Sequence, residues 1–229
     1  MSKIGILLVE DHRMVRQGFL KILGLQSDFE VLGEAEEGRR AVALASALCP
    51  AVVVMDIAMP LLNGLEAARQ MLRERPELRI VLVSAYGELG YVKRALELGV
   101  GGFLLKHSSV EDLYLAIRRV AAGGSFFPRE LLRRFRVSLA SGKGEAVRAR
   151  EGDNFGRGGL SVREMEVLQL IAEGYSNKQT AAELGIGIKT VEKHRGHIME
   201  KLGVHETAGL TRYALETGVV ECRGLAKVW

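Results

Sequence analysis

Residues 51–60 read AVVVMDIAMP, an apolar run with the length of one β-strand that stops at the carboxylate of Asp56. Continuous apolar runs of about four to eight residues are typical of strands buried on both faces of a parallel sheet. Three similar runs also stop at polar side chains: Lys3–Val9 stops at Glu10 and Asp11, Arg79–Val83 at Ser84, and Gly101–Leu105 at Lys106. The carboxyl ends of parallel strands share one edge of the sheet, where ligands bind. The sequence therefore predicts that these five side chains, up to 96 positions apart, meet at one site.

The five side chains combine three carboxylates with a hydroxyl and an ammonium. Clustered carboxylates suit a hard divalent cation such as Mg²⁺, and a lysine beside a hydroxyl suits a phosphoryl group. Because neighbouring acids repel one another, a cation is needed to keep all three ionised near neutral pH. The residue types therefore predict a magnesium-dependent phosphoryl site.

Strand-like and helical patterns alternate five times over residues 1–122, which predicts an α/β domain with a doubly wound, five-stranded parallel sheet of the flavodoxin-like kind. Residues 123–159 are rich in glycine and charge and are interpreted as a linker, with a short basic helix over Arg129–Leu139. From residue 160 to 229 the pattern is purely helical, which predicts a small all-α domain. Its helices Lys178–Leu184, which we expect Asn177 to cap, and Ile188–Leu202 fit a helix-turn-helix.

Composition argues against several classes of protein. Two cysteines far apart in sequence, without a CxxC motif, disfavour a disulfide scaffold and a zinc site. No apolar run reaches the ~20 residues of a membrane helix and no signal peptide is recognisable, so we expect a cytoplasmic protein with no membrane partner. The net charge of +4 lies wholly in residues 123–159, with 8 Lys and Arg against 4 Asp and Glu; the flanking segments hold 15 and 9 charges of each sign. Overall basicity is therefore poor evidence for DNA binding here.

Residues 1–122 resemble the receiver domain of two-component response regulators. The resemblance rests on motifs at matching spacing: Glu10–Asp11, MDIAMP with Asp56 and Pro60, Asn63–Gly64, Ser84–Ala85, and FLLK at 103–106. It implies that Asp56 accepts a phosphoryl group from a phosphohistidine of a sensor histidine kinase. It also implies Mg²⁺ held by Asp11 and Asp56, with Glu10 near the ion or bound through water, and the backbone carbonyl of Ala58 as a further ligand.

In such a site, Lys106 is expected to pair with Asp56 and with the phosphoryl group, and Ser84 to hydrogen-bond a phosphoryl oxygen once Asp56 is modified. Drawing Ser84 inward vacates space beside the fourth strand, into which Phe103 can rotate as part of a switch. A phosphoryl group with a charge of about −1.5 to −2 supplies a differential energy of the size that such a switch needs. The alternative is that Phe103 is an ordinary core residue.

The predicted helix over Ile188–Leu202 has an apolar stripe and a polar remainder. Val191, Ile198 and Leu202 form the stripe and should face the core of the domain. The residues expected to contact DNA lie elsewhere: Lys189, Lys193 and Gly196 opposite the stripe, Glu192 and His197 beside it, and Lys178, Thr190, Arg195 and Lys201 on phosphates. A mixture of lysine and glutamate is equally typical of a solvated helix face, so the helix by itself leaves that alternative open.

Residues 160–220 resemble the LuxR-type effector domain of the NarL/FixJ class of response regulators. The matching residues are Leu160-Ser161-x-Arg163-Glu164, GYSNK at 174–178, TVEKH at 190–194, and Ile198-x-x-Lys201-Leu202. The resemblance implies that the second helix of the helix-turn-helix enters the major groove of double-stranded DNA. Gly187 departs from the Ser or Thr that the family usually has as the cap of this helix, at a cost of about a few tenths of a kcal/mol.

The combined prediction is a phosphorylation-dependent transcription regulator, not an enzyme, that binds promoter DNA through residues 188–202 as a homodimer when phosphorylated or DNA-bound. In this class the unmodified receiver often occludes the recognition helix, which stands as a hypothesis here. The rival is a Mg²⁺-dependent phosphohydrolase with Asp56 as nucleophile. Such enzymes usually need a second general acid two positions on, where this chain has Ala58. A third hypothesis is a receiver that regulates a protein partner without touching DNA.

Overall fold

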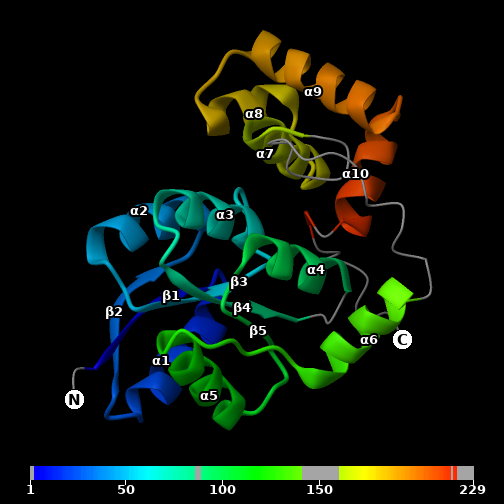
Figure 1. Cartoon of the computed structure of the whole chain (residues 1–229). Coiled ribbons are helices and arrows are strands. Elements are labelled where there is room, and N and C mark those ends of the chain that lie inside the picture. The colour runs from blue at the N-terminus through cyan, green and yellow to red at the C-terminus, as the bar shows by residue number, and fades with distance from the viewer. Residues whose placement is uncertain (1–2, 86–88, 141–159, 218, 221–229) are drawn as a thin grey trace, which may run out of the picture. The chain divides into compact units, whose positions relative to one another are not determined.

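The computed structural model describes residues 3–85, 89–140, 160–217 and 219–220, and the chain divides into two compact units, residues 1–141 and 142–229. The first unit is built on a five-stranded parallel sheet with the strand order β2-β1-β3-β4-β5 (Figure 1). Its strands are β1 Ile4–Val9, β2 Phe29–Ala35, β3 Val52–Asp56, β4 Arg79–Ser84 and β5 Gly102–Leu105. The predicted doubly wound fold is confirmed.

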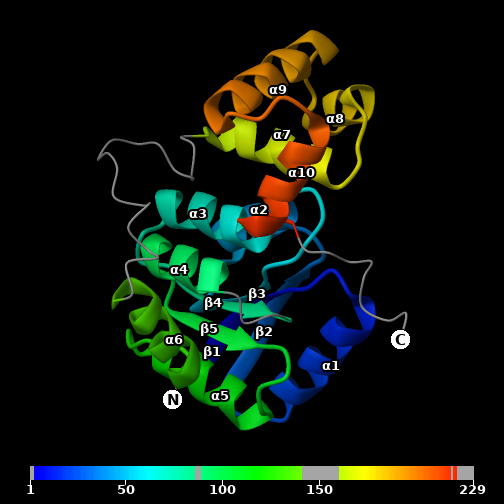
Figure 2. The ribbon, with the colours of Figure 1, turned by 90° about the vertical axis from the view of Figure 1, so that its right-hand side faces the viewer.

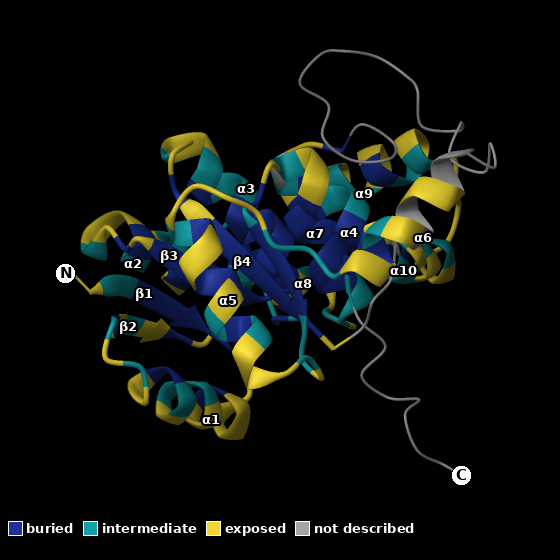
Figure 3. Cartoon of the chain, turned by 60° about the horizontal axis from the view of Figure 1, so that its bottom comes forward, coloured by how far each residue is buried: buried dark blue, intermediate teal, exposed yellow. Residues whose placement is uncertain are grey.

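Five helices cover the two faces of this sheet (Figures 1 and 2). On one face lie α1 Arg13–Gly24 and α5 Val110–Ala121, and on the other lie α2 Gly38–Leu48, α3 Gly64–Glu74 and α4 Leu89–Leu98. Alternate residues of β1 enter the two cores, Ile6 and Leu8 on the α1 and α5 face, and Leu7 and Val9 on the other. Burial on both faces explains the unbroken apolar runs of β1, β3 and β4, and β4 lies dark between exposed outer helix surfaces in Figure 3.

The helix expected near the start of the predicted linker forms as α6, Arg129–Ala140. Leu131 on its inner side is buried in the core cluster that includes Tyr91 of α4, and the backbone N–H of Phe103 donates to the carbonyl of Phe126, 2.8 Å away, just before the helix. The start of the predicted linker therefore packs against the sheet-containing unit. Residues 141–159 of that linker lie outside the described residues, and the domain boundaries remain a prediction.

The described part of the second unit consists of α7 Val162–Ala172, α8 Asn177–Leu184, α9 Ile188–Leu202 and α10 Thr207–Glu216. The prediction that Asn177 caps α8 is wrong. Ser176 is the cap, because the spacing Ser-x-x-Gln lets Ser176 and Gln179 exchange hydrogen bonds with each other's backbone N–H groups in a capping box. Gly187 does cap α9 without a side-chain hydrogen bond, as expected. None of the described helices has the length and apolarity needed to cross a membrane.

The loop after β3 holds Asp56 in place through Gly64, the first residue of α3. A Cβ atom at Gly64 would stand 2.1 Å from the backbone oxygen of Asp56 and 2.9 Å from the Cα of Ile57, and neither backbone atom can move aside cheaply. We expect Gly64→Ala to lower the free energy of unfolding by about 1–3 kcal/mol, as measured by urea denaturation. In the matched control Gly18→Ala, on an exposed face of α1 where a Cβ meets nothing within 4 Å, stability should rise by about 0.5–1 kcal/mol. Equal effects of the two variants would refute this account of the loop.

Candidate functional site

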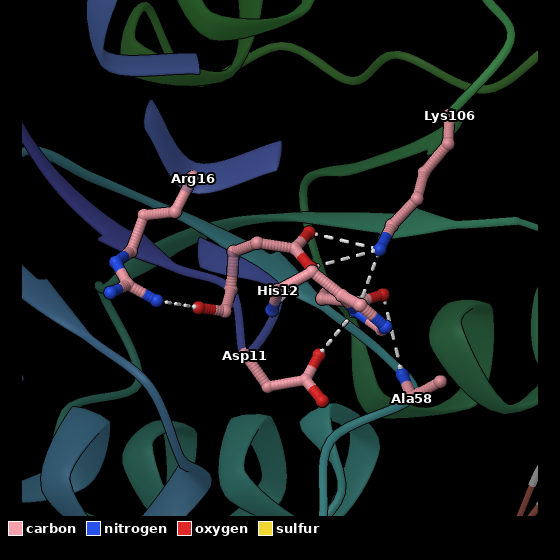
Figure 4. Close-up of polar contacts among 7 residues, drawn as sticks. Asp11, His12, Arg16, Ala58 and Lys106 are labelled. Atoms are coloured by element: carbon pink, nitrogen blue, oxygen red, sulfur yellow. Dashed lines mark hydrogen bonds and ion pairs between the residues drawn. The ribbon is translucent and has the colours of Figure 1, made fainter. Parts of the chain in front are cut away.

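The predicted convergence of side chains occurs at the carboxyl edge of β1, β3, β4 and β5, which are consecutive neighbours in the sheet. Glu10 follows β1, Asp56 ends β3, Ser84 ends β4 and Lys106 follows β5. Figure 4 shows the Lys106 side chain reaching across this edge toward the acidic groups. Parallel strand direction alone brings these residues together, because every strand ends on the same side.

The Lys106 ammonium is shared by two buried carboxylates. Its Nζ atom lies 2.8 Å from Oδ2 of Asp56 and 2.9 Å from Oε2 of Glu10, and it donates a hydrogen bond to Oε1 of Glu10 at 3.1 Å. The side chains of Glu10 and Asp56 are each only 1% exposed. One positive charge thus stabilises two negative charges that have little contact with water.

An acidic cluster suited to a cation surrounds this ion pair. Glu10, Asp11, His12 and Asp56 each offer one ligand atom, and these atoms lie within 4.8 Å of one another. Oε2 of Glu10 is buried and, although it lies near the Lys106 ammonium, accepts no hydrogen bond from the described residues. A buried carboxylate oxygen that accepts no hydrogen bond, among other carboxylate oxygens, matches the ligands that Mg²⁺ takes in proteins. The backbone N–H of Ala58 donates to Oδ1 of Asp56 at 3.3 Å, which also holds that carboxylate in place.

The electrostatics of the site make the Asp56 carboxylate harder to ionise than an ordinary aspartate. Burial, followed by repulsion from Glu10, raises the pKa of Asp56 to about 6, while Lys106 acts in the opposite direction. Burial disfavours the Lys106 ammonium, but its ion pairs with Asp56 and Glu10 outweigh that cost and raise the pKa of Lys106. Lys106 therefore stays charged near neutral pH, and the site as it stands has a surplus of negative charge that a cation would relieve.

Ser84 and Phe103 are both completely buried. The backbone carbonyl of Ser84 accepts a hydrogen bond from the N–H of Lys106 at 2.7 Å, which ties the ends of β4 and β5 together. Phe103 pairs with Leu82 in the sheet register and belongs to the core cluster that includes residues of α4. Its position fits a core residue, and its role in a switch stays a prediction.

Two further residues contact this site although the sequence did not predict a role for them. The exposed ring of His12 lies with Nδ1 2.9 Å from Oδ1 of Asp11, and the Arg16 guanidinium donates to the backbone carbonyl of Glu10 at 2.8 Å. Arg16 also pairs with Glu34 in β2 at 3.2 Å and with Glu36, just after that strand, at 2.6 Å (Figure 4 shows its bond to the Glu10 segment). The pairs of Arg16 with Glu34 and Glu36 form because α1 packs beside β2, so no local sequence signal marks them.

In the second unit, the side chains expected to contact DNA are exposed. Val191 and Ile198 of α9 are completely buried, as the apolar stripe predicts. Eight of the nine residues expected to contact DNA are exposed: Lys178, Lys189, Thr190, Glu192, Lys193, Gly196, His197 and Lys201. Arg195, expected on a phosphate, instead donates to the hydroxyl of Thr207 and to Oδ1 of Asn177, the latter at 3.4 Å.

Glu164 anchors α9 to the start of α7. One of its carboxylate oxygens accepts from the backbone N–H of Ser161 at 2.7 Å and lies 2.7 Å from Nζ of Lys201. Burial alone would raise the pKa of Glu164, but the hydrogen bonds from Lys201 and Ser161 outweigh it and lower the pKa. Lys201 thus positions the recognition helix in this structure, and its contact with a DNA phosphate stays a prediction.

The turn between α8 and α9 has its own anchor on α7. The guanidinium of Arg163 donates to the backbone carbonyl of Leu184, 2.5 Å away at the end of α8, and pairs with Glu166 at 2.6 Å. The last carbonyl groups of a helix have no partner within the helix, so a side-chain donor there stabilises the turn. The two helices of the pair are therefore each fixed to α7 by a charged side chain.

Comparison with known proteins gives matches for both units. Residues 6–118 match the family model of response regulator receiver domains, and residues 159–214 match that of bacterial regulatory proteins of the LuxR family. Over 218 residues the chain is 35% identical to response regulator protein VraR of Staphylococcus aureus, covering 95% of this chain and 99% of VraR.

Solved structures of response regulators are also similar to this chain. RcsB from Salmonella enterica serovar Typhimurium, bound to a promoter in the presence of a phosphomimetic, has a TM-score of 0.60 and 25% identity, covering 94% of this chain and 100% of RcsB. The receiver domain of a putative response regulator NarL from Mycobacterium tuberculosis has a TM-score of 0.51 and 33% identity, covering 54% of this chain and 99% of that domain.

The raised pKa of Asp56 predicts how stability depends on pH. Between its ordinary value of 3.8 and about 6, the folded chain retains a proton that the unfolded chain has released, so the contribution of Asp56 to stability falls as pH rises through this window. We expect Asp56→Asn to exceed the wild type in free energy of unfolding by about 1–3 kcal/mol at pH 7.5 without divalent cations, and to match it near pH 4.

Chemical denaturation across this pH range checks the prediction. Adding MgCl₂ at pH 7.5 should stabilise the wild type more than the variant, because the variant lacks one of the proposed ligands. A stability difference that does not change with pH would contradict the unfavourable burial of the Asp56 charge.

The two functions of Glu164 can be separated by two substitutions. Glu164→Gln keeps the side-chain acceptor of the capping box but removes the ion pair with Lys201, and we expect a decrease of about 1 kcal/mol in the free energy of unfolding at pH 7. Glu164→Ala removes both and should cost about 2–3 kcal/mol. Urea denaturation at pH 7 measures both variants, and equal decreases would show that the capping box contributes nothing beyond the ion pair.

Proposed function

Because this chain belongs to the two-component response regulators that join a receiver domain to a LuxR-type DNA-binding domain, we propose that it controls transcription when a sensor histidine kinase phosphorylates Asp56. The observation that carries the proposal is the Lys106 ammonium, 2.8 Å from Asp56 and 2.9 Å from Glu10 at the carboxyl edge of the sheet. A carboxylate nucleophile next to a fixed positive charge and further carboxylates is the arrangement that phosphoryl transfer needs.

In the transfer, the P–N bond of the kinase phosphohistidine breaks, its electron pair stays on the histidine nitrogen, and an oxygen of Asp56 forms the new P–O bond. Asp56 reacts as the ionised carboxylate, which predominates above its pKa of about 6. Lys106 stays beside Asp56 and neutralises part of the charge on the transferred group. We assign Mg²⁺ to Asp11, Asp56 and the carbonyl of Ala58, with Glu10 bound directly or through water. When bound, the ion neutralises charge on the phosphoryl oxygens.

The response to phosphorylation begins at Ser84. Its hydroxyl is at the end of the strand next to β3, and we assign it as the hydrogen-bond donor to a phosphoryl oxygen on Asp56. Movement of Ser84 toward Asp56 would favour the inward position of Phe103, which is completely buried in this structure. The new charge of about −1.5 to −2 supplies the energy difference between the two states.

We assign DNA reading to α9. Its exposed face carries Lys189 and Lys193, neither of which forms an ion pair within the described residues, and Gly196 between the basic side chains allows close approach to a groove. The relative RcsB has been solved on a promoter, which supports this assignment. A homodimer on paired half-sites follows because one helix-turn-helix buries little surface on DNA. We place this activity in the cytoplasm, where kinase and DNA are both accessible.

The family consists of transcription regulators, and we propose that this chain takes up one phosphoryl group per site rather than turning over substrate. The position two residues after Asp56 is Ala58, which offers no general acid for a phosphohydrolase reaction. The chain therefore serves as a stoichiometric acceptor whose product is a changed protein surface.

The proposal is tested by phosphorylation with acetyl phosphate and Mg²⁺, followed by footprinting on genomic DNA. We expect one base-labile phosphoryl group per wild-type chain, none on Asp56→Asn, and tighter DNA binding only by the labelled wild type. Lys193→Ala should take up the label normally but bind the protected sites about tenfold more weakly, since a base or phosphate contact is worth about 1–3 kcal/mol.

Two outcomes would replace this function by its rivals. Continued release of inorganic phosphate beyond one equivalent per chain would indicate a phosphohydrolase. Normal labelling of Asp56 without any footprint on DNA would indicate a receiver that acts on a protein partner.

A further inference from the structure

The helix α6 carries most of the net positive charge of the chain. Residues 123–159 contain 8 Lys and Arg against 4 Asp and Glu, whereas the segments on either side are electrically balanced. The sequence of α6, RELLRRFRVSLA, holds four of these arginines and a single glutamate. Neither the phosphoryl site nor α9 accounts for this concentration of charge.

Three of the α6 arginines, Arg129, Arg133 and Arg136, lie on one outward face. Leu131 is 3% exposed and belongs to the core cluster of the first unit. Another set of residues, at the i, i+3, i+4, i+7 and i+8 spacing of a single helix face, lines one surface concavity: Arg129, Leu132, Arg133, Arg136 and Val137. We call this set the α6 outer face. Figure 3 shows the exposed surface of this helix.

Little of this positive charge is neutralised by neighbours. Arg133 pairs with Glu130 at 2.7 Å, but both side chains are more than 60% exposed, so the pair contributes little and Arg133 can exchange partners. Arg129 and Arg136 form no ion pair with any residue in the described ranges. Guanidinium groups that project into water from a rigid helix are well suited to bind phosphate oxygens through paired hydrogen bonds.

We propose that the α6 outer face binds the phosphate backbone of DNA flanking the site read by α9, without regard to base sequence. The inference rests on the proposed function, because α9 must first hold the DNA. Nineteen residues separate Ala140 from Leu160, and such a segment spans at most about 70 Å. DNA held by α9 is therefore within reach of α6. Because the connecting segment keeps α6 near that DNA, it raises the effective concentration of α6 at the DNA.

Two other occupants fit the α6 outer face less well. A second copy of the chain would bring arginines against arginines, and like charges across an interface are unfavourable. A membrane surface favours helices with a broad apolar face of large side chains, whereas the apolar members here are Leu132 and Val137. Phosphate contacts need only the charge and the donors, which this face has.

The experiment measures how salt weakens DNA binding by the full-length chain. Binding to two fluorescein-labelled duplexes of unrelated mixed sequence, each of about 60 base pairs, is followed by anisotropy over a range of KCl concentrations. In the triple variant Arg129→Gln, Arg133→Gln, Arg136→Gln, we expect a shallower slope of log K against log salt on both duplexes. The slope should change by about 0.9 for each phosphate that α6 no longer neutralises, hence by about 2 to 3 in total.

Matched variants separate a local contact from a general effect of charge. The control Arg40→Gln, Arg73→Gln, Arg119→Gln changes the net charge equally, at exposed arginines elsewhere on the first unit, and should leave the slope near the wild-type value. Replacing the three α6 arginines by lysine should preserve most of the slope, because charge is retained, and circular dichroism verifies that each variant is folded.

The outcomes distinguish this inference from the function on which it rests. If the α6 triple variant keeps the wild-type slope while Lys193→Ala weakens binding, the DNA-binding function stands and the role of α6 is refuted. If the control triple variant lowers the slope as much as the α6 variant, the local contact is also refuted. Loss of cosedimentation with phosphatidylserine vesicles by the α6 variant, without a change in DNA slope, would overturn the inference in favour of a membrane surface.

Discussion

The functional edge of the sheet depends on one ammonium group that holds two buried carboxylates. Glu10 and Asp56 are almost inaccessible to water, and both lie within 3 Å of Nζ of Lys106. Without that charge, two acids in a space of low dielectric would repel each other and take up a proton. Even with it, the pKa of Asp56 is raised to about 6. The pair therefore leaves a deficit of positive charge, which makes the site receptive to a cation and then to a phosphoryl group.

The surroundings of the ion pair fix its geometry through the backbone. Gly64 allows the loop after β3 to pack directly on the backbone oxygen of Asp56, and Asn63 caps the helix that begins there by accepting the N–H of Glu66. Arg16 holds the carbonyl of Glu10 from the side of β2. These contacts limit the freedom of the acidic residues, so that a change of charge at Asp56 must be accommodated by neighbouring side chains and not by the loop.

In the second unit, charged side chains also fix the backbone, and here they hold the helix pair in position. Glu164 and Arg163, adjacent in the first turn of α7, fix α9 through Lys201 and the end of α8 through the carbonyl of Leu184. These bonds lie on the inner side of the helix pair, and they leave Lys189 and Lys193 exposed. A recognition surface of this kind is preorganised, since its helices are held by groups that do not have to contact DNA.

The pattern of residue types was enough to predict the sheet, the order of its elements and the convergence of Glu10, Asp56, Ser84 and Lys106, because buried parallel strands have unbroken apolar runs and end at a common edge. The capping box that Ser161 and Glu164 form at the start of α7 also rests on local spacing. The cap of α8 was misplaced, because Ser176 and Asn177 are both good caps and only the partner Gln179 distinguishes them.

Other features became visible only in the folded chain. Arg16 pairs with Glu34 and Glu36, Arg195 and Lys201 are engaged within their own domain, and Phe103 lies in the core. Each of these outcomes depends on which elements pack together. No local spacing encodes a contact between residues that are distant in the chain and become neighbours when it folds.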